Sequence, residues 1–406
     1  MKQTIFLAMM VLTGMLLPAQ RPDVTMKFYG FVRNDFFYNS RANEEAIDGT
    51  LHLIPRPVVR NNAGVDINAA PQAEMISINT RIGIDFTGSP ILGAKSSAKI
   101  EFDFAGTGTT FFLAQIRHAY MQLNWEKSAL LVGQTWHPLF GSVVPSGVSF
   151  NSGAPFQPFN RSPQVRLTHQ LFKNITLMGV ASYQMQHNSN GPLGFTSAYM
   201  KNALRPNVYA GAELKKQNLL VGAGIDLKKI KPDTLSVRSL AAVGYAQYVK
   251  PGLQIKMKSV IGQNLSDHFM MGGYGYGASL SSDETTYHYY NLGNWSSFLN
   301  VLYGKKWQVG IFAGYLENLG IFASVLEPIN GKYRVYGRGF YNDSQQIINN
   351  MYRFAPMVIY NLPNLNIGLE YNYSSAEYGT IGANGIGSNP YRIGNHRVVV
   401  AINYLF

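Results

Sequence analysis

The segment Val398–Phe406 has the pattern of one β-strand with two different faces. Every second residue counted back from Phe406 is aromatic or branched aliphatic, and successive residues of a strand point to opposite sides. The other face holds Ala401 and Asn403, which tolerate water. This pattern is typical of the strand that closes a transmembrane β-barrel, with Tyr404 and Phe406 as its membrane-insertion terminus. A soluble strand that ends in phenylalanine is the alternative.

Residues 1–19 have the features of a cleavable secretory signal. A basic start precedes an apolar stretch from Ile5 to Leu17, and Leu-Pro-Ala precedes Gln20. No other segment approaches the roughly 18 consecutive apolar residues of a membrane helix. A membrane location therefore requires strands. We expect residues 20–406 to form a single barrel domain in the outer membrane of a Gram-negative bacterium, in contact with its lipid.

The charge balance excludes some classes of function. The chain has 34 Lys and Arg, 22 Asp and Glu, and no cysteine. The lack of cysteine argues against a disulfide-stapled secreted module. Basicity could indicate nucleic acid, but there is no basic run or binding module, so no nucleic-acid partner is expected. The scattered histidines lack the spacing of metal ligands, and no cofactor or metal is expected.

Strand-like runs with alternating faces recur along the chain. The runs are Met26–Tyr38, Met75–Phe86, Ala98–Ala105, Ala114–Asn124, Ala129–Trp136, Gln164–Leu171, Ile175–Gln186, Asn207–Leu214, Leu219–Lys228, Val237–Val249, Leu253–Gly262, Trp295–Tyr303, Trp307–Tyr315, Met351–Leu362, Leu365–Ser374 and Arg397–Phe406. Short connections alternate with long ones, as periplasmic turns alternate with extracellular loops in bacterial barrels. The chain is therefore predicted to be all-β, a transmembrane antiparallel β-barrel of about sixteen strands.

Five polar residues on the early strands are placed on the outer side by this alternation: Asn34, Thr80, His118, Gln122 and Gln134. Polar groups that face lipid are costly unless they have partners. Either the assigned register slips, or these strands face another subunit. The second interpretation makes the five residues a subunit interface and the protein a homo-oligomer, expected to be a homotrimer.

The third long connection, His137–Pro163, has an unusual composition for an exposed loop. It is rich in proline and in large apolar residues such as Phe140, Phe156 and Phe159, types that are usually buried. We expect residues 137–163 to fold into the barrel and narrow it to a constriction. Packing of the loop on the outside or on a neighbouring subunit is the alternative.

Basic residues are predicted to face the lumen near that loop: Arg33, Arg81, Arg117, Arg161 and Arg166. Arginines around a narrow pore raise the local concentration of anions, and a guanidinium group can hold a carboxylate through two hydrogen bonds. We expect a pore constriction that binds small anionic solutes. Simple charge pairing with acidic residues on adjacent strands is the competing interpretation.

Three short stretches carry a family resemblance: Gly133–Trp136, Phe140 and Phe159–Arg166. They resemble the DcaP-like trimeric porins of Gram-negative outer membranes. The resemblance is specific over roughly Gly133–Arg166, and the coiled-coil segment that some members carry before Met26 is missing. It implies sixteen strands, trimers and passive passage of small anions such as dicarboxylates. The alternative is a non-conducting surface barrel whose long loops bind a partner or a glycan.

An enzyme is the third possibility. His187–Gly191 matches the His-x-Ser-Asn-Gly pattern of outer-membrane phospholipase A, in which Ser189 would be the nucleophile, His187 its base and Asn202 the residue that orients the base. Pro192 stands where that family has arginine, and polar loops commonly contain such residues. We expect no catalytic residues and no enzymatic activity.

Overall fold

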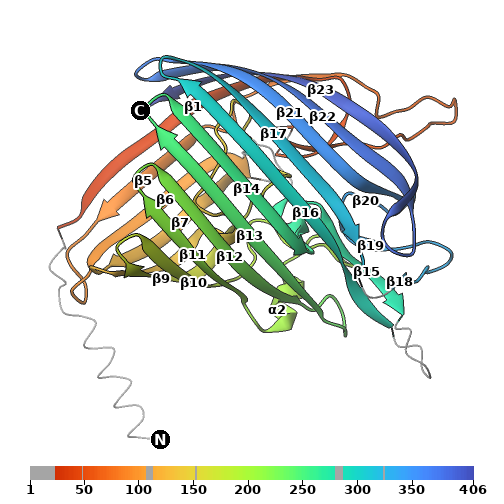
Figure 1. The fold of residues 1–406 in the computed structure, drawn as a ribbon, viewed down its shortest axis with the longest axis horizontal. Coiled ribbons are helices and arrows are strands. Elements are labelled where there is room, and N and C mark those ends of the chain that lie inside the picture. Colours follow the sequence, from red (N-terminus) through yellow and green to blue (C-terminus); the bar gives the residue numbers. More distant parts are fainter. Residues whose placement is uncertain (1–22, 48, 107–112, 151–152, 279–286, 323–324) are drawn as a thin grey trace, which may run out of the picture.

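The computed structural model describes residues 23–47, 49–106, 113–150, 153–278, 287–322 and 325–406. The predicted signal, residues 1–19, lies outside the described residues. The chain forms an antiparallel sheet that closes on itself as a barrel of sixteen strands (Figure 1). In ring order the strands are β1 (Thr25–Asn39), β5 (Arg81–Thr87), β6 (Lys95–Gly106), β7 (Leu113–Asn124), β8 (Ser128–Trp136), β9 (Arg161–Phe172), β10 (Ile175–Ser182), β11 (Asn207–Lys216), β12 (Leu219–Ile230), β13 (Val237–Lys250), β14 (Leu253–Gln263), β16 (Tyr287–Gly304), β17 (Trp307–Gly320), β21 (Gln346–Asn361), β22 (Leu365–Ile381) and β23 (Gly387–Leu405).

Shorter elements occupy the connections at the end of the barrel with the long loops. They are β2 (Asn43–Ala46), β3 (Leu51–Pro55), β4 (Gln72–Ile76), β15 (Gly272–Ala278), β18 (Val325–Leu326), β19 (Val335–Arg338), β20 (Phe340–Tyr341), the single helical turns η2 (Pro138–Phe140) and η3 (Ser266–His268), and the helix α2 (Ala198–Ala203). Several of them extend the wall, because β15 pairs with β16, β18 and β19. The sequence pattern predicts loops for these segments, apart from Met75 and Ile76 of β4, which belong to the predicted strand Met75–Phe86.

The barrel is sealed between its first and last strands. β1 pairs with β23 along a continuous antiparallel register. The backbone N–H of Gly30 donates to the carbonyl of Phe406 at 3.0 Å, and Phe406 N–H donates back at 3.1 Å. A Cβ atom at Gly30 would lie only 2.4 Å from the carbonyl oxygen of Arg81 and 2.8 Å from the Phe406 ring, so the seam requires glycine. The prediction of a sixteen-stranded antiparallel barrel is confirmed.

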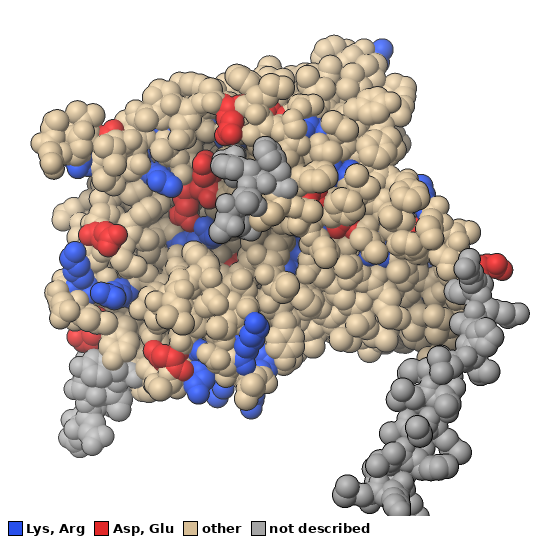
Figure 2. Space-filling model, turned by 180° about the vertical axis from the view of Figure 1, so that it is seen from behind, with Lys and Arg blue, Asp and Glu red and all other residues tan. Residues whose placement is uncertain are grey.

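The outer face of the wall is apolar. On β23, Ile402 and Tyr404 are 44% and 52% exposed, whereas Val399 and Ala401 between the outward residues are buried. Figure 2 shows much of the wall without charge, while basic and acidic side chains gather around a hollow. Among the described residues, no helix is long and apolar enough to cross a membrane. Tyr404 and Phe406 lie on the outer surface, and their part in membrane insertion stays a prediction.

The first long connection also fills the barrel, which the sequence analysis did not predict. Leu51, Leu53 and Ile54 of β3 are fully buried in the same apolar cluster as the loop after β8. Arg353 of β21 donates to the carbonyl oxygens of His52 and Leu53 at 3.1 and 3.0 Å. The hairpin formed by β2 and β3 is therefore fixed to β21 through its backbone.

Replacing Arg353 with methionine should lower the free energy of unfolding by about 3 kcal/mol or more, because buried carbonyl groups lose their charged donor. The expected result is a lower urea midpoint for the refolded protein in detergent micelles. Arg392→Met is the matched control, since Arg392 is a partly exposed arginine paired with Glu377. Equal midpoints for the two variants would contradict this role of Arg353.

A basic cluster inside the barrel

The loop between β8 and β9 reaches strands on the far side of the barrel. Ser146 N–H donates to Oδ1 of Asn300 on β16 at 2.8 Å, and Lys256 of β14 donates to the Ser146 hydroxyl at 2.8 Å. Val148 N–H donates to Oε2 of Glu370 on β22 at 3.0 Å. These strands are distant from β8 and β9 in the ring. The tip of the loop therefore lies within the barrel.

Apolar side chains hold the rest of this loop against the inner wall. Leu139, Phe140 and Phe156 are nearly or fully buried and belong to one apolar cluster with residues of β13, β16 and β17. The Phe156 ring lies 6.0 Å from that of Phe312 on β17. Burial of such side chains contributes roughly 1.5–3 kcal/mol each. The proline-rich, apolar composition thus serves packing inside the barrel.

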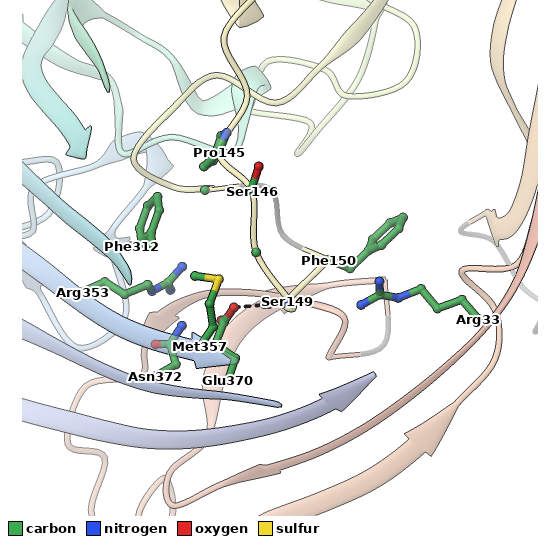
Figure 3. A pocket seen from close by; sticks show the side chains of 12 residues that line it. Arg33, Pro145, Ser146, Ser149, Phe150, Phe312, Arg353, Met357, Glu370 and Asn372 are labelled. Carbon is green, nitrogen blue, oxygen red and sulfur yellow. Dashed lines mark hydrogen bonds between the residues drawn. The ribbon is translucent and has the colours of Figure 1, made fainter. Parts of the chain in front are cut away.

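A cavity of about 150 Å³ lies beside the loop tip (Figure 3). Glu370 accepts the backbone N–H groups of Val148 and Ser149 at 3.0 and 3.1 Å. On the other side of the tip, Arg33 donates to the Val148 carbonyl at 2.6 Å. Arg353 donates to the carbonyl of Ala154 at 2.7 Å. Side chains of opposite charge from β1, β21 and β22 therefore hold the loop in place through hydrogen bonds to its backbone.

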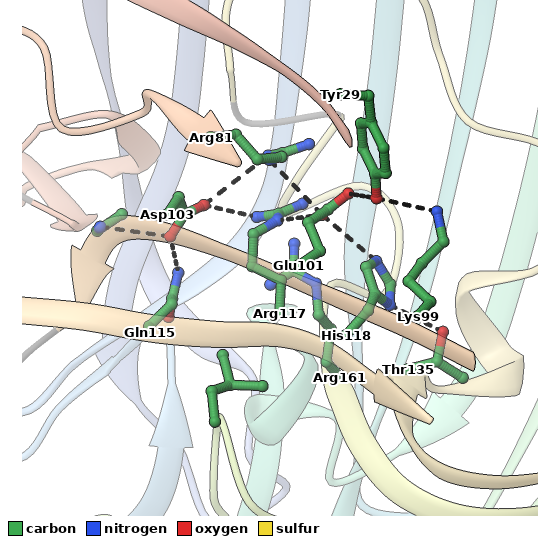
Figure 4. Close-up of polar contacts among 12 residues, drawn as sticks. Tyr29, Arg81, Lys99, Glu101, Asp103, Gln115, Arg117, His118, Thr135 and Arg161 are labelled. Atoms are coloured by element: carbon green, nitrogen blue, oxygen red, sulfur yellow. Dashed lines mark hydrogen bonds and ion pairs between the residues drawn. The ribbon is translucent and has the colours of Figure 1, made fainter. Parts of the chain in front are cut away.

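Three of the predicted arginines line one cavity of about 330 Å³ together with Glu101. Asp103 forms ion pairs with two of them (Figure 4). Arg117 is fully engaged: its Nε donates to Glu101 at 2.7 Å and its Nη1 donates to Asp103 at 2.9 Å. Arg81 makes longer ion pairs with the same two carboxylates, at 3.6 and 3.8 Å. We call Arg81, Arg117 and Arg161, with Glu101 and Asp103, the basic cluster.

Arg161 is the least satisfied member of the basic cluster. It is 1% exposed, its guanidinium stacks 3.8 Å from the Trp136 ring centroid, and Nη1 donates to Gln186 at 3.0 Å. Among the described residues, its Nε and Nη2 have no hydrogen-bond partner, and neither does Nε of Arg81. Buried donors without acceptors are costly. The basic cluster therefore has both an excess of positive charge and N–H groups able to bind an anion.

The remaining two predicted arginines lie outside that cavity. Arg33 pairs with Asp35 and lies beside the loop tip, with Phe150 between it and Arg81 at 5.3 and 5.6 Å from the ring centroid. Arg166 donates to Gln164 and to the Trp136 carbonyl. The predicted set is thus divided into a cluster of three, one residue beside the loop tip and one residue that lines neither cavity.

The outward placement of His118 and Gln122 was wrong. The ladder between β6 and β7 shifts register after the pair Glu101–His118, so that Arg117 is the extra residue of a bulge. His118 consequently joins the lumen network, with Nδ1 at 3.0 Å from the Thr135 hydroxyl. Gln122 lies on the same face by alternation. A bulge places two successive residues on one side, which alternation alone does not reveal.

Asn34, Thr80 and Gln134 have hydrogen-bond partners within their own wall. Oδ1 of Asn34 accepts the Ser77 hydroxyl at 2.6 Å, and Nε2 of Gln134 donates to a backbone carbonyl of β7 at 2.7 Å. The Thr80 hydroxyl accepts a backbone N–H of β1 at 3.2 Å. These bonds reduce the cost of polar groups on the outer side. Their proposed role as a subunit interface remains a prediction.

Two of the residues that anchor the loop, Glu370 and Lys258, were not among the predicted site residues. Glu370 lies opposite the apolar face of β22, but its partners Val148 and Ser149 lie more than two hundred positions away in the sequence. Lys258 of β14 is equally hidden: it is buried and donates to the Phe140 carbonyl and to Oε1 of Gln157. The only indication in the sequence was a charged residue on the lumen face of a strand. Its contact with the loop was not predictable.

The triad expected for a phospholipase is not assembled. Ser189 is fully buried, its hydroxyl accepts a hydrogen bond from Gln184 at 2.9 Å, and its N–H donates to the same side chain. Among the described residues, Nε2 of His187 has no hydrogen-bond partner, and its ring packs 4.0 Å from that of Phe269. Asn202 is exposed on α2. Ser189 thus has a structural role in this loop.

Three buried histidines of the loops predict a dependence of stability on pH. Burial lowers the pKa of His268 to about 4, and it lowers the pKa of His137 and His187 well below the usual value. The unfolded chain therefore binds protons between about pH 6.5 and 4 that the fold excludes. The free energy of unfolding should fall as pH falls through this window, by roughly 3 kcal/mol for His268 alone.

Urea midpoints of the refolded protein at pH 7 and pH 4 test this dependence. His268→Gln should reduce the difference between the two midpoints, because glutamine cannot be protonated. A matched control is His288→Gln, since His288 is exposed on β16. An equal pH difference in both variants would show that His268 does not contribute to it.

Comparison with solved structures reveals the class of fold. The outer membrane channel DcaP of Acinetobacter baumannii superposes with a TM-score of 0.65 at 17% identity, over 94% of this chain and 97% of that one. The anion-selective porin from Comamonas acidovorans superposes with a TM-score of 0.54 at 10% identity, over 95% and 100%. OmpT of Vibrio cholerae, in its trimer form, has a TM-score of 0.54 at 10% identity, over 94% and 99%.

No protein-family model matches the sequence, and no curated protein matches it by sequence comparison. At the identities given above, the similarity to solved structures concerns the fold. That fold agrees with the architecture implied by the segment Gly133–Arg166 and with the predicted location in the outer membrane. The chain has the fold of the outer-membrane porins of Gram-negative bacteria, and the DcaP channel is among its structural relatives.

Proposed function

We propose that the protein is a passive diffusion channel of the outer membrane that prefers small anionic solutes. The observation that carries this proposal is the basic cluster. Three guanidinium groups face two carboxylates beside a cavity of about 330 Å³, and Arg81 and Arg161 keep buried N–H groups without partners among the described residues. Charge pairing and anion attraction coexist here, because the acidic groups do not neutralise the arginines.

The selectivity follows from the position of the cluster. A pore wall with an excess of positive charge and little water focuses the potential and raises the local concentration of anions. Arg161 is held flat on Trp136, so its free edge presents parallel N–H groups to a carboxylate. The loop of residues 137–163 narrows the path beside these groups. Dicarboxylates are the substrates we would test first, as the resemblance to DcaP-like porins implies.

The zero-current potential of the refolded protein in a planar bilayer under a KCl gradient tests this function. The expected result is stepwise openings with a potential that favours chloride. A potential that favours potassium would refute the anion preference while leaving a porin. The absence of openings, with the barrel shown to be folded by its heat-modified migration in gels, would favour the non-conducting surface barrel.

The oligomeric state is part of the proposal. A structural neighbour is a trimer, and the expected interface is the outer side of the early strands, which includes Asn34, Thr80 and Gln134. Light scattering of mildly solubilised protein should give three times the mass of one chain. A monomer under these conditions would refute the homotrimer and would leave the function of the single barrel to be judged by its conductance.

A further inference from the structure

A groove on the outer wall combines basic side chains with an apolar floor. It has a volume of about 480 Å³ and lies on β11, β12 and β13 near the end with the long connections, close to α2 (Figure 1). Its floor is a row of direct cross-strand neighbours, Val208, Leu227 and Leu240. Each of the three is at least half exposed. This floor is part of the apolar outer face of the barrel.

The next row toward the rim is basic. Lys229 and Arg238 are direct cross-strand partners, and each lies two residues beyond a leucine of the floor, so they share its outward face. Arg205, just before β11, lines the same groove and is exposed. Like charges directly opposite each other on adjacent strands are destabilising. This arrangement is favourable only if a negative group lies between them.

The described part of the chain does not supply that negative group. Among the described residues, the ammonium group of Lys229 and the guanidinium groups of Arg238 and Arg205 have no ion pair and no hydrogen bond, and Nδ2 of Asn291 contacts Arg238 only by donating to its backbone carbonyl. Asp233, in the connection after β12, accepts hydrogen bonds from Leu235 N–H and from a tyrosine hydroxyl of β16. The cations of the groove are therefore available to an external anion.

We propose that this groove binds a phosphorylated lipid of the surrounding membrane. The phosphate lies between Lys229 and Arg238 with Arg205 beside it, and the acyl chains lie along Val208, Leu227 and Leu240. Guanidinium and ammonium groups form strong charge-assisted hydrogen bonds with phosphate oxygens, and cations near an anionic headgroup strengthen membrane attachment. A free phosphate ion would gain nothing from contact with the apolar floor, whereas acyl chains would be buried against it. The site is independent of whether the barrel conducts.

Native mass spectrometry of the refolded barrel in detergent can test this site with dioleoyl phosphatidate as the probe. Phosphatidate should remain bound where dioleoyl phosphatidylcholine dissociates. Lys229→Gln combined with Arg238→Gln should weaken phosphatidate binding by about 30-fold. The matched control combines Lys216→Gln with Lys250→Gln, exposed lysines at the opposite end of β11 and β13, and it should retain the affinity of the unchanged protein.

A further variant, Arg205→Gln, lies outside the strands and cannot disturb the ladder, so weaker binding in it would not reflect misfolding. Equal binding of the two lipids would overturn the proposal, because the cations would then have no role. The same loss in the control variant would reduce the site to general electrostatic attraction and would also overturn it. Complete displacement by millimolar inorganic phosphate would assign the site to a free anion instead of a lipid.

Discussion

Exchanging Arg81 and Arg161 for glutamine is expected to reverse the ion preference of the channel. Arg117 would then face Glu101 and Asp103 alone, so the local charge beside the cavity would change from positive to negative. Because the potential in a narrow site controls the local concentration of ions, the ratio of chloride to potassium permeability should fall by about tenfold. The zero-current potential under a KCl gradient measures this change directly.

Two matched variants separate charge from geometry in this experiment. Arg392→Gln removes an arginine whose partner, Glu377, lies on β22 away from the basic cluster, and it should leave the potential unchanged. Replacing Arg81 and Arg161 with lysine keeps the charge but removes the planar donor pair. This variant should keep the chloride preference and lose affinity for dicarboxylates. An unchanged preference in the glutamine variant would place the selectivity elsewhere.

Releasing the tip of the loop between β8 and β9 should have the second largest effect. Glu370→Ala combined with Asn300→Ala removes the acceptors of three backbone N–H groups, those of Ser146, Val148 and Ser149. Hydrogen bonds to a buried carboxylate are strong, so the anchored state should lose about 3–5 kcal/mol. That loss is enough to make a released tip a major population. Single-channel conductance should rise, and larger polyethylene glycols should enter the pore.

The control for this variant uses a carboxylate on the same strand. Glu377 of β22 is a partly exposed residue whose partner is Arg392, and Glu377→Ala combined with Asn361→Ala should change neither conductance nor the size limit. If the Glu370 and Asn300 variant conducts like the unchanged protein, then the loop does not set the width of the pore. Its heat stability, measured in parallel, would show whether the tip had been released.

The alternation of side chains predicted most of the barrel. β22 shows why: over Leu365–Tyr373 it has outward aromatic and aliphatic residues at every second position and small or polar residues between them. This pattern depends only on the geometry of one strand and the difference between lipid and lumen. The ring order then follows because neighbours in sequence pair as antiparallel neighbours in space. The extension of the wall by β15, which pairs with β16, was not predicted, because β15 is rich in glycine and lacks an apolar face.

A bulge and contacts between residues far apart in the sequence explain the features that were not predicted. The bulge at Arg117 changed the face of His118 and Gln122, and a bulge leaves no reliable mark in a single sequence. The basic cluster was partly predictable, because its arginines lie on the lumen faces of three nearby strands, β5, β7 and β9. Which of the five predicted arginines belong to the basic cluster was not predictable, because the position of Arg161 depends on stacking with Trp136. The hairpin formed by β2 and β3 fills the barrel, although three apolar residues within Leu51–Ile54, interrupted only by His52, could have indicated burial.

The seam between β1 and β23 has a consequence for biogenesis. Its partners, such as Phe31 and Leu405, are separated by almost the whole chain, so their contact costs the most loop-closure entropy in the molecule. Before β23 has been synthesised, the growing sheet has two open edges, each able to pair with another chain. The polypeptide must therefore be kept apart from its neighbours during export. Sealing at Gly30 is then a late, all-or-none event that ends this vulnerable period.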